Sequence, residues 1–177
     1  MKNTRQRYDM ENIILRPWSL EDTETLVSLF NNITIWNNMR DYVPHPYTTV
    51  DAEVFINAQL DINPAINFAI IDGDLLVGGI GIVLKSDVYR MNVEVAYWIG
   101  EPFQGKGIAT EAVRQMTAYV FQSFVVNRVV AEVFEYNKPS MRVLEKNGYF
   151  LETVSRKGIL KNEFLYDNYI WVCQKIF

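Results

Sequence analysis

The stretch from residue 92 to residue 111 constrains the fold most, because it changes from a strand pattern to a helix pattern across a glycine loop. β-Forming hydrophobic residues at every second position predict a strand over 92–99. Gly100 and Pro102 end that pattern, and a pattern with a helical period follows. It predicts an amphipathic helix whose apolar face consists of Ala109, Ala112, Val113, Met116 and Val120.

The loop between the two patterns, residues 104–109, reads Gln-Gly-Lys-Gly-Ile-Ala. The first N–H groups of a helix lack internal partners, and the helix dipole favours negative charge there. Gly105 and Gly107 would let phosphate oxygens approach the backbone, and Lys106 adds a positive charge. The spacing matches neither a P-loop nor a dinucleotide fingerprint. The loop therefore indicates an anion site or, equally, a plain strand-to-helix turn that needs glycine for its geometry.

The composition predicts one folded domain and disfavours several classes of function. The 177 residues are 49% hydrophobic and 21% charged, which is typical of a chain that builds its own core. A net charge of -4 and a pI of about 5.1 disfavour nucleic-acid binding. Cys173 is the only cysteine, so neither an intrachain disulfide nor a cysteine-based zinc cluster can form, and we expect no metal.

The sequence contains neither an apolar run of about 18 residues nor a basic-then-apolar leader. We therefore expect a cytoplasmic protein with no membrane partner. The polar residues 1–11 are expected to form a flexible tail, and residues 12–177 a single domain.

The first half of the chain predicts a strand and two helices. A strand at 13–15 precedes a helix capped by Ser19, with an inward face of Leu20, Thr23, Leu26, Val27 and Phe30. Residues 31–47 have an irregular pattern. A second helix beginning near Thr49 is expected to carry on its apolar face Val50, Val54, Phe55 and Ala58.

The remaining elements complete an α/β domain. A hairpin turns at Asp72-Gly73, and its second, glycine-rich strand indicates a bulge or close packing. A strand at 128–134 follows the central helix, which predicts a right-handed parallel crossover. Another helix and two strands, near 150–160 and 164–174, end the chain. The order β-α-α-β-β-β-α-β-α-β-β predicts a mixed, mostly antiparallel sheet flanked by helices.

Three motifs carry a resemblance to a known family. Gln104-x-x-Gly107-x-Ala109 resembles the Gln/Arg-x-x-Gly-x-Gly/Ala signature of the GNAT superfamily of N-acyltransferases. Residues 94–99, Glu-Val-Ala-Tyr-Trp-Ile, look like the central strand of that family. Residues 137–149, Asn-x-x-Ser-x-Arg-Val-Leu-Glu-Lys-x-Gly-Tyr, are similar to the branch that acetylates ribosomal-protein N-termini. The predicted element order is also that of the family, so the resemblance covers nearly the whole chain.

The resemblance implies acetyl-CoA as the co-substrate. In the family, the central strand and the next parallel strand separate, pantetheine lies between them, and the glycine loop binds pyrophosphate. A backbone N–H on the central strand would donate a hydrogen bond to the oxyanion. The implied cofactor contacts are Tyr97, Trp98, Ile99, Gln104, Gly105, Lys106, Gly107, Ile108, Ala109, Thr110, Asn137 and Ser140.

Acetyl transfer to an amine also needs a group that accepts the amine proton and a group that donates to the leaving thiolate. Glu94 is the candidate general base, because a carboxylate on a central strand is expected to be partly desolvated; the alternative is a solvated or lysine-paired glutamate. Ser140 is the candidate near the sulfur; the alternative is a serine that bonds its own helix backbone. Many family members place a tyrosine where this chain has Leu144, which leaves Ser140 or a water as the donor.

The acceptor is the least determined part of the reaction. Trp36, His45 and Glu94 are candidate acceptor contacts, with core packing or a surface position as the alternatives for the first two. Three functions remain open: acetyl transfer to a protein α-amine, acetyl transfer to a small amine such as a polyamine, an aminoglycoside or a metabolite, and non-catalytic acyl-CoA binding. Members of the family are often homodimers, and the sequence leaves the oligomeric state open.

Overall fold

A single seven-stranded sheet in the order β1-β2-β3-β4-β5-β7-β6 organises the computed structural model, which describes residues 12–175. The expected tail at 1–11 lies outside the described residues. All neighbouring strands are antiparallel except β4 and β5, which are parallel, so the predicted mixed, mostly antiparallel sheet is confirmed. The strands are β1 (Ile13–Arg16), β2 (Asn67–Asp72), β3 (Leu75–Leu84), β4 (Asn92–Ile99), β5 (Arg128–Phe134), β6 (Phe150–Lys161) and β7 (Phe164–Gln174).

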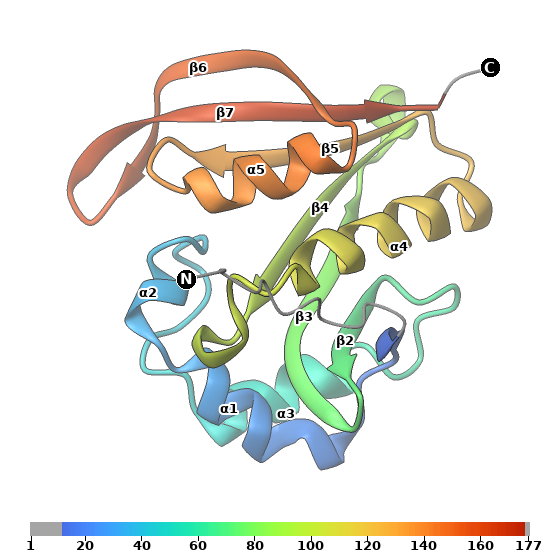
Figure 1. Cartoon of the computed structure of the whole chain (residues 1–177), viewed down its shortest axis with the longest axis vertical. Helices are drawn as coiled ribbons and strands as arrows, with labels where there is room; N and C mark the ends of the chain where they lie inside the picture. The colour runs from blue at the N-terminus through green and yellow to red at the C-terminus, as the bar shows by residue number, and fades with distance from the viewer. Residues whose placement is uncertain (1–11, 176–177) are drawn as a thin grey trace, which may run out of the picture.

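Helices cover both faces of this sheet (Figure 1). Buried residues of α4 and α5 join one apolar core with β2–β5, and buried residues of α1–α3 join a second core on the other face. None of the described helices is long and apolar enough to cross a membrane. The helices are α1 (Thr23–Phe30), α2 (Ile33–Trp36), α3 (Thr49–Asn57), α4 (Ile108–Ser123) and α5 (Lys138–Lys146). The short helix α2 lies within the segment that the sequence predicted to be irregular.

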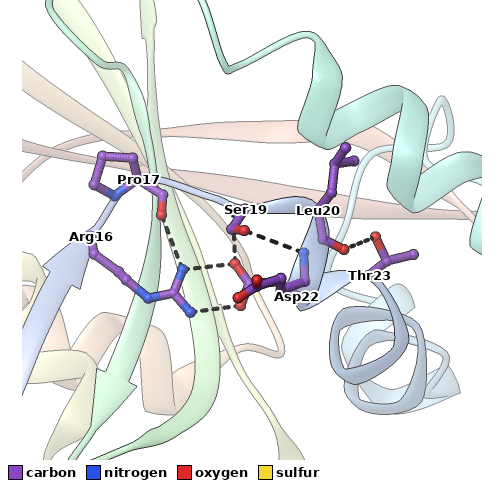
Figure 2. Close-up of polar contacts among 7 residues, drawn as sticks. Arg16, Pro17, Ser19, Leu20, Asp22 and Thr23 are labelled. Carbon is purple, nitrogen blue, oxygen red and sulfur yellow. Dashed lines mark hydrogen bonds and ion pairs between the residues drawn. The ribbon is translucent and has the colours of Figure 1, made fainter.

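The start of α1 has the predicted cap, extended by an ion pair (Figure 2). A 3₁₀ turn, Leu20–Asp22, precedes the helix, and Ser19 and Asp22 form a reciprocal capping box. Both carboxylate oxygens of Asp22 also accept hydrogen bonds from the Arg16 guanidinium, at 2.6 and 2.7 Å. The prediction that Leu20 faces inward is wrong, because it lies in the 3₁₀ turn rather than in the α-helix and is 48% exposed.

The predicted inward face of α3 is also wrong in part. Val50 and Val54 are 66% and 65% exposed, whereas Ala52 and Ile56 are fully buried. Apolar residues lie on several sides of this helix, so its pattern does not select one face. The packing of α3 against α1 selects Ala52 and Ile56 for the core.

The glycines of β3 allow close packing against β4, as one of the two alternatives predicted. A Cβ atom at Gly79 would lie 2.7 Å from Nε1 of Trp98, and one at Gly78 would lie 2.3 Å from the carbonyl oxygen of Trp98. Only glycine fits this approach. The register between β2 and β3 also shifts between Ile70 and Ile71, so the predicted irregularity is present as well.

Candidate active site

β4 and β5 separate partway along their length, and this opening positions the site. Only residues 92–94 of β4 pair with residues 128–130 of β5. Further along, β4 keeps β3 as its neighbour and β5 keeps β7, so the two strands diverge (Figure 1). Among the described strands, β5 contributes no ladder partner to residues 97–99. An open strand edge of this kind can pair with an extended ligand.

A cavity of about 560 Å³ lies beside this opening, within the usual range for ligand sites. Of the predicted cofactor contacts, it is lined by Tyr97, Trp98, Ile99, Gln104, Gly105, Gly107, Ile108, Ala109, Thr110, Asn137 and Ser140. Lys106 is outside this lining, and its ammonium lies 5.3 Å from the centre of the Phe103 ring. The tertiary structure therefore gathers nearly all of the predicted cofactor residues around one cavity.

The glycine loop adopts a conformation that requires its glycines. Gly105 and Gly107 have φ angles of +75° and +89°, in the left-handed region that disfavours other residues. Gly107 is the N-cap of α4 and provides no side-chain cap. Nε2 of Gln104 donates to the carbonyl oxygen of Ile99 at 2.9 Å, which attaches the loop to the end of β4. The uncapped start of α4 thus borders the cavity, where the helix dipole favours an anion.

The opposite wall is the start of α5. Oδ1 of Asn137 caps this helix by accepting from the amide of Ser140 at 3.3 Å. The hydroxyl oxygens of Ser140 and Tyr97 are 2.8 Å apart, so the Ser140 side chain bonds a strand residue rather than its own backbone. Burial raises the pKa of Tyr97 to about 12, against the opposing effect of this hydrogen bond. Leu144, one turn later, is fully buried.

Several lining residues were not predicted from the sequence. Arg142 and Lys146 of α5 bring two cations to the cavity wall, although Arg142 also forms an ion pair with Glu145 at 2.7 Å. Their spacing of four positions places them on one helix face, and that signal was present in the sequence. α2 and the residues after it also line the cavity, but no sequence pattern predicted this. These lining residues are Thr34, Ile35, Asn38 and Met39.

Glu94 lies where β4 and β5 still pair, at the base of the opening, and it is 6% exposed. The expected desolvation is therefore present. However, one carboxylate oxygen accepts from Nη2 of Arg40 and the other from Nζ of Lys85 at 2.7 Å. Arg40 also lies 3.7 Å from the Glu132 carboxylate on β5. Glu94 is therefore paired with a lysine, as the alternative interpretation expected, and its role as a general base stays a prediction.

Trp36 and His45, the two remaining acceptor candidates, pack together in the region between α1 and α3. Their ring centres are 5.5 Å apart, and Nε1 of Trp36 donates to the carbonyl oxygen of Val43 at 2.8 Å. Nζ of Lys161, at the end of β6, lies 3.5 Å from the centre of the Trp36 ring. Neither Trp36 nor His45 lines the 560 Å³ cavity, and their contact with an acceptor stays a prediction.

A second hollow, of about 270 Å³, lies beside the Arg40 and Glu132 pair. It shares Met39 with the larger cavity. Its lining contains side chains of both charges, namely Arg40 and Lys161 with Asp41 and Glu132. Within residues 12–175, no group of three His, Cys, Asp or Glu side chains is arranged to hold a metal ion.

The fold and the cavity define an α/β acyltransferase, and a comparison with protein families agrees with this. Residues 12–149 match the family model described as the acetyltransferase (GNAT) domain. The chain therefore belongs to the GNAT acetyltransferase family. It is an acetyl-CoA-dependent N-acetyltransferase that acts on an amine, as the sequence predicted.

Named relatives align with half or more of the chain. The probable N-acetyltransferase YjcK of Bacillus subtilis is 27% identical over an alignment 165 residues long, which covers 86% of this chain and 88% of YjcK. The ribosomal-protein-serine acetyltransferase of Escherichia coli is 33% identical over an alignment 93 residues long, which covers 51% of this chain and 49% of that enzyme. The structure is also similar to the microcin C7 self-immunity acetyltransferase MccE in complex with acetyl-CoA and AMP. That similarity has a TM-score of 0.81 at 25% identity, covering 97% of this chain and 98% of MccE.

Proposed function

We propose that acetyl-CoA binds in the 560 Å³ cavity, with its pantetheine arm along residues 97–99 and its pyrophosphate at the loop 104–109. The observation that carries this proposal is the separation of β4 from β5, because it opens a strand edge directly beside the uncapped start of α4. Asn137 would contact the arm from the mouth of α5. Arg142 and Lys146 add positive charge for the phosphates on the same wall.

The reaction proposed at this site is a direct transfer. The neutral amine attacks the thioester carbonyl, and a backbone N–H from residues 97–99 stabilises the oxyanion. When the intermediate collapses, the carbon–sulfur bond breaks with its electron pair on sulfur, beside Ser140. The amine loses one proton, and the coenzyme thiolate gains one from solvent, so the reaction balances. Glu94 lines neither hollow and would take the amine proton through water.

A protein α-amine is the acceptor class that we favour. The second hollow supports this, because it adjoins the cofactor cavity at Met39 and presents both cations and carboxylates. A chain N-terminus offers an amine followed by peptide carbonyl groups and varied side chains, which suits a wall of mixed charge. The named activity of the Escherichia coli relative, a ribosomal-protein-serine acetyltransferase, is of the same class.

A small amine is the second candidate acceptor. The volume of the second hollow, about 270 Å³, is slightly below the usual range for ligand sites and suits a small molecule.

A mass-spectrometric screen of acetyl transfer tests these proposals. The purified protein is incubated with acetyl-CoA and separate panels of peptides with different N-termini, ribosomal proteins, amino acids and polyamines. We expect a peptide or protein panel to react fastest, and acetylation mapped to the first residue would identify the α-amine. Faster reaction with free amines would favour the second candidate. Calorimetric binding of acetyl-CoA without transfer to any panel would instead support a non-catalytic acyl-CoA-binding domain.

A further inference from the structure

Two hydroxyl groups from distant parts of the chain meet in the wall of the cofactor cavity. Tyr97 lies on β4 and Ser140 on α5, and both line the cavity. Their side-chain oxygens are 2.8 Å apart, a short and favourable distance for two hydroxyl groups. The Tyr97 hydroxyl can also donate to the carbonyl oxygen of Ser140, at the longer distance of 3.3 Å. Its single hydrogen makes the stronger bond in the shorter contact, to Oγ. The pair therefore joins the two walls between which the reacting thioester would lie.

The direction of this hydrogen bond decides what Ser140 can do. A serine hydroxyl has one hydrogen to donate and two lone pairs that accept. If Ser140 donated to Tyr97, it would have no hydrogen left for a sulfur atom in the cavity. If Tyr97 donates to Ser140, the hydrogen of Ser140 stays available for the cavity. The α5 cap makes no demand on this hydroxyl, because Asn137 accepts from the backbone amide of Ser140.

We propose that Tyr97 is a positioning residue, which donates to Oγ of Ser140 and so directs the Ser140 hydroxyl hydrogen toward the sulfur of acetyl-CoA. The inference rests on the cofactor site proposed above and assigns the Tyr97 side chain a role separate from backbone contacts with pantetheine. A phenol is a stronger donor and a weaker acceptor than an aliphatic hydroxyl, which favours this direction. Burial also raises the pKa of Tyr97 to about 12, so the phenol keeps its proton at any working pH.

The chemical role of the directed hydroxyl is to stabilise charge. As the carbon–sulfur bond breaks, its electron pair moves onto sulfur, and the Ser140 hydroxyl donates a hydrogen bond to the developing thiolate. An aliphatic hydroxyl is a much weaker acid than a thiol, so the proton stays on Ser140 and no alkoxide forms. The amine proton leaves as in the proposed reaction, and Tyr97 undergoes no change of its own.

The test is a double-mutant cycle on the full chain with Tyr97→Phe, Ser140→Ala and the double variant. Tyr149→Phe is the matched control, because it removes another buried tyrosine hydroxyl that lies 2.8 Å from a side-chain hydroxyl, here Thr117. Neither Tyr149 nor Thr117 lines the cavity. The kcat and KM for acetyl-CoA are measured with the best acceptor from the screen, and thermal unfolding checks that each variant is folded.

If Tyr97 acts through Ser140, Tyr97→Phe lowers kcat by roughly 3- to 10-fold and leaves KM for acetyl-CoA within about twofold. Ser140→Ala lowers kcat by about tenfold, the scale of one charge-stabilising hydrogen bond. The double variant should be no slower than Ser140→Ala, because the effect of Tyr97 disappears when its target is absent. Tyr149→Phe should keep the kcat of the wild type.

Several outcomes would overturn the proposal. An unchanged kcat in Tyr97→Phe would do so, and so would a double variant whose loss is the product of the two single losses. An equal loss in Tyr149→Phe would show that any buried hydroxyl in this core has the same effect. Calorimetry of acetyl-CoA with the same proteins separates these failures from failure of the proposed cofactor site. Wild-type protein that does not bind acetyl-CoA would overturn that site. Normal binding together with an unchanged kcat in Tyr97→Phe would overturn only the role of Tyr97.

Discussion

Arg40 donates a hydrogen bond to the buried carboxylate of Glu94, although 54 positions separate the two residues in the chain. Arg40 follows α2, and Glu94 lies on the central strand, with Lys85 on its other carboxylate oxygen. The candidate base therefore also connects the region between α2 and α3 to the sheet. Removing its charge would leave Lys85 without this partner and Arg40 with Glu132 alone. A useful variant must therefore keep the shape of the side chain and be compared with a neighbouring carboxylate.

Glu94→Gln, measured from pH 6 to pH 10, tests the base and the acceptor class together. An α-amine has a pKa near 8 and an alkylamine one near 10, so about one α-amine in ten is neutral at pH 7, against fewer than about one alkylamine in a thousand. With an α-amine acceptor we expect a moderate loss of kcat, much of it recovered one or two pH units higher. With an alkylamine the loss should be larger, and recovery should continue toward pH 10.

The control for this profile is Glu132→Gln, which alters the other carboxylate near Arg40 at a more exposed position. Glu132 lines the proposed acceptor hollow, so this variant can change KM for the acceptor, but the pH dependence of kcat should keep its shape. A Glu94→Gln profile that overlays the wild type from pH 6 to pH 9 would rule out the general-base role.

Gly107→Val should weaken binding of acetyl-CoA. Gly107 has a φ of +89° and is the uncapped start of α4, so a branched side chain strains the loop and occupies the approach of a phosphate. We expect the dissociation constant to rise by at least about tenfold, and the strain to cost about 1 to 2 kcal/mol of folding stability. Titration calorimetry and thermal unfolding measure the two effects.

Gly73→Val is the matched control for this variant. Gly73 also has a positive φ, +62°, but it lies in the turn between β2 and β3, with open space around its Cβ position. It should show a comparable loss of stability with unchanged affinity for acetyl-CoA. Unchanged affinity in a folded Gly107→Val protein would mean that the phosphates bind elsewhere.

Asp22→Asn should destabilise the protein in a pH-dependent way. Burial of Asp22 acts to raise its pKa, but hydrogen bonds from Arg16 and Ser19 outweigh it and hold the pKa below the ordinary value (Figure 2). A lowered pKa stabilises the folded protein above the ordinary value near 4, and this stability is lost as the pH falls through the lowered value. The loss in the variant should be about 2 kcal/mol at pH 7 and should shrink below about pH 4.

Urea unfolding of the two proteins at pH 3 to 7 measures this difference. Asp51→Asn is the control, because Asp51 occupies the same capping-box position in the first turn of α3 but has no arginine partner among the described contacts. Its loss should be smaller than that of Asp22→Asn. Equal losses, or a loss in Asp22→Asn that is independent of pH, would contradict the role given to Arg16.

Lys161→Met should loosen the region between α2 and α3. Lys161 is 2% exposed, with its ammonium 3.5 Å from the centre of the Trp36 ring and 2.7 Å from the Asp41 carboxylate. Methionine keeps much of the apolar contact but loses both charged interactions, at a cost of about 1 to 2 kcal/mol. Hydrogen exchange of residues 37–47 should accelerate. The control is Lys157→Met, on an exposed part of β6, which should change neither the stability nor the exchange of residues 37–47. Equal exchange in both variants would contradict the role given to Lys161.

The sequence by itself determined the central elements of this protein. The period-two pattern predicted the bounds of β4, and the helical pattern predicted most of the buried face of α4, because alternation along a strand and helical spacing follow directly from local backbone geometry. Asn137 and Gly148 likewise marked the ends of α5, since a cap and a left-handed stop are local requirements. The glycine-dependent turn at 104–109 could be predicted for the same reason, whereas its role in cofactor binding came from the family resemblance and stays a prediction.

Only the tertiary structure decided contacts between residues that are distant in the chain. The buried face of α3, the pairing of Glu94 with Arg40 and the hydroxyl pair of Tyr97 and Ser140 have no local signature. The last pair is 43 positions apart and meets because β4 and the start of α5 border the same opening in the sheet. Local patterns fix the direction of a side chain relative to its own element, whereas packing of the elements fixes what that side chain meets.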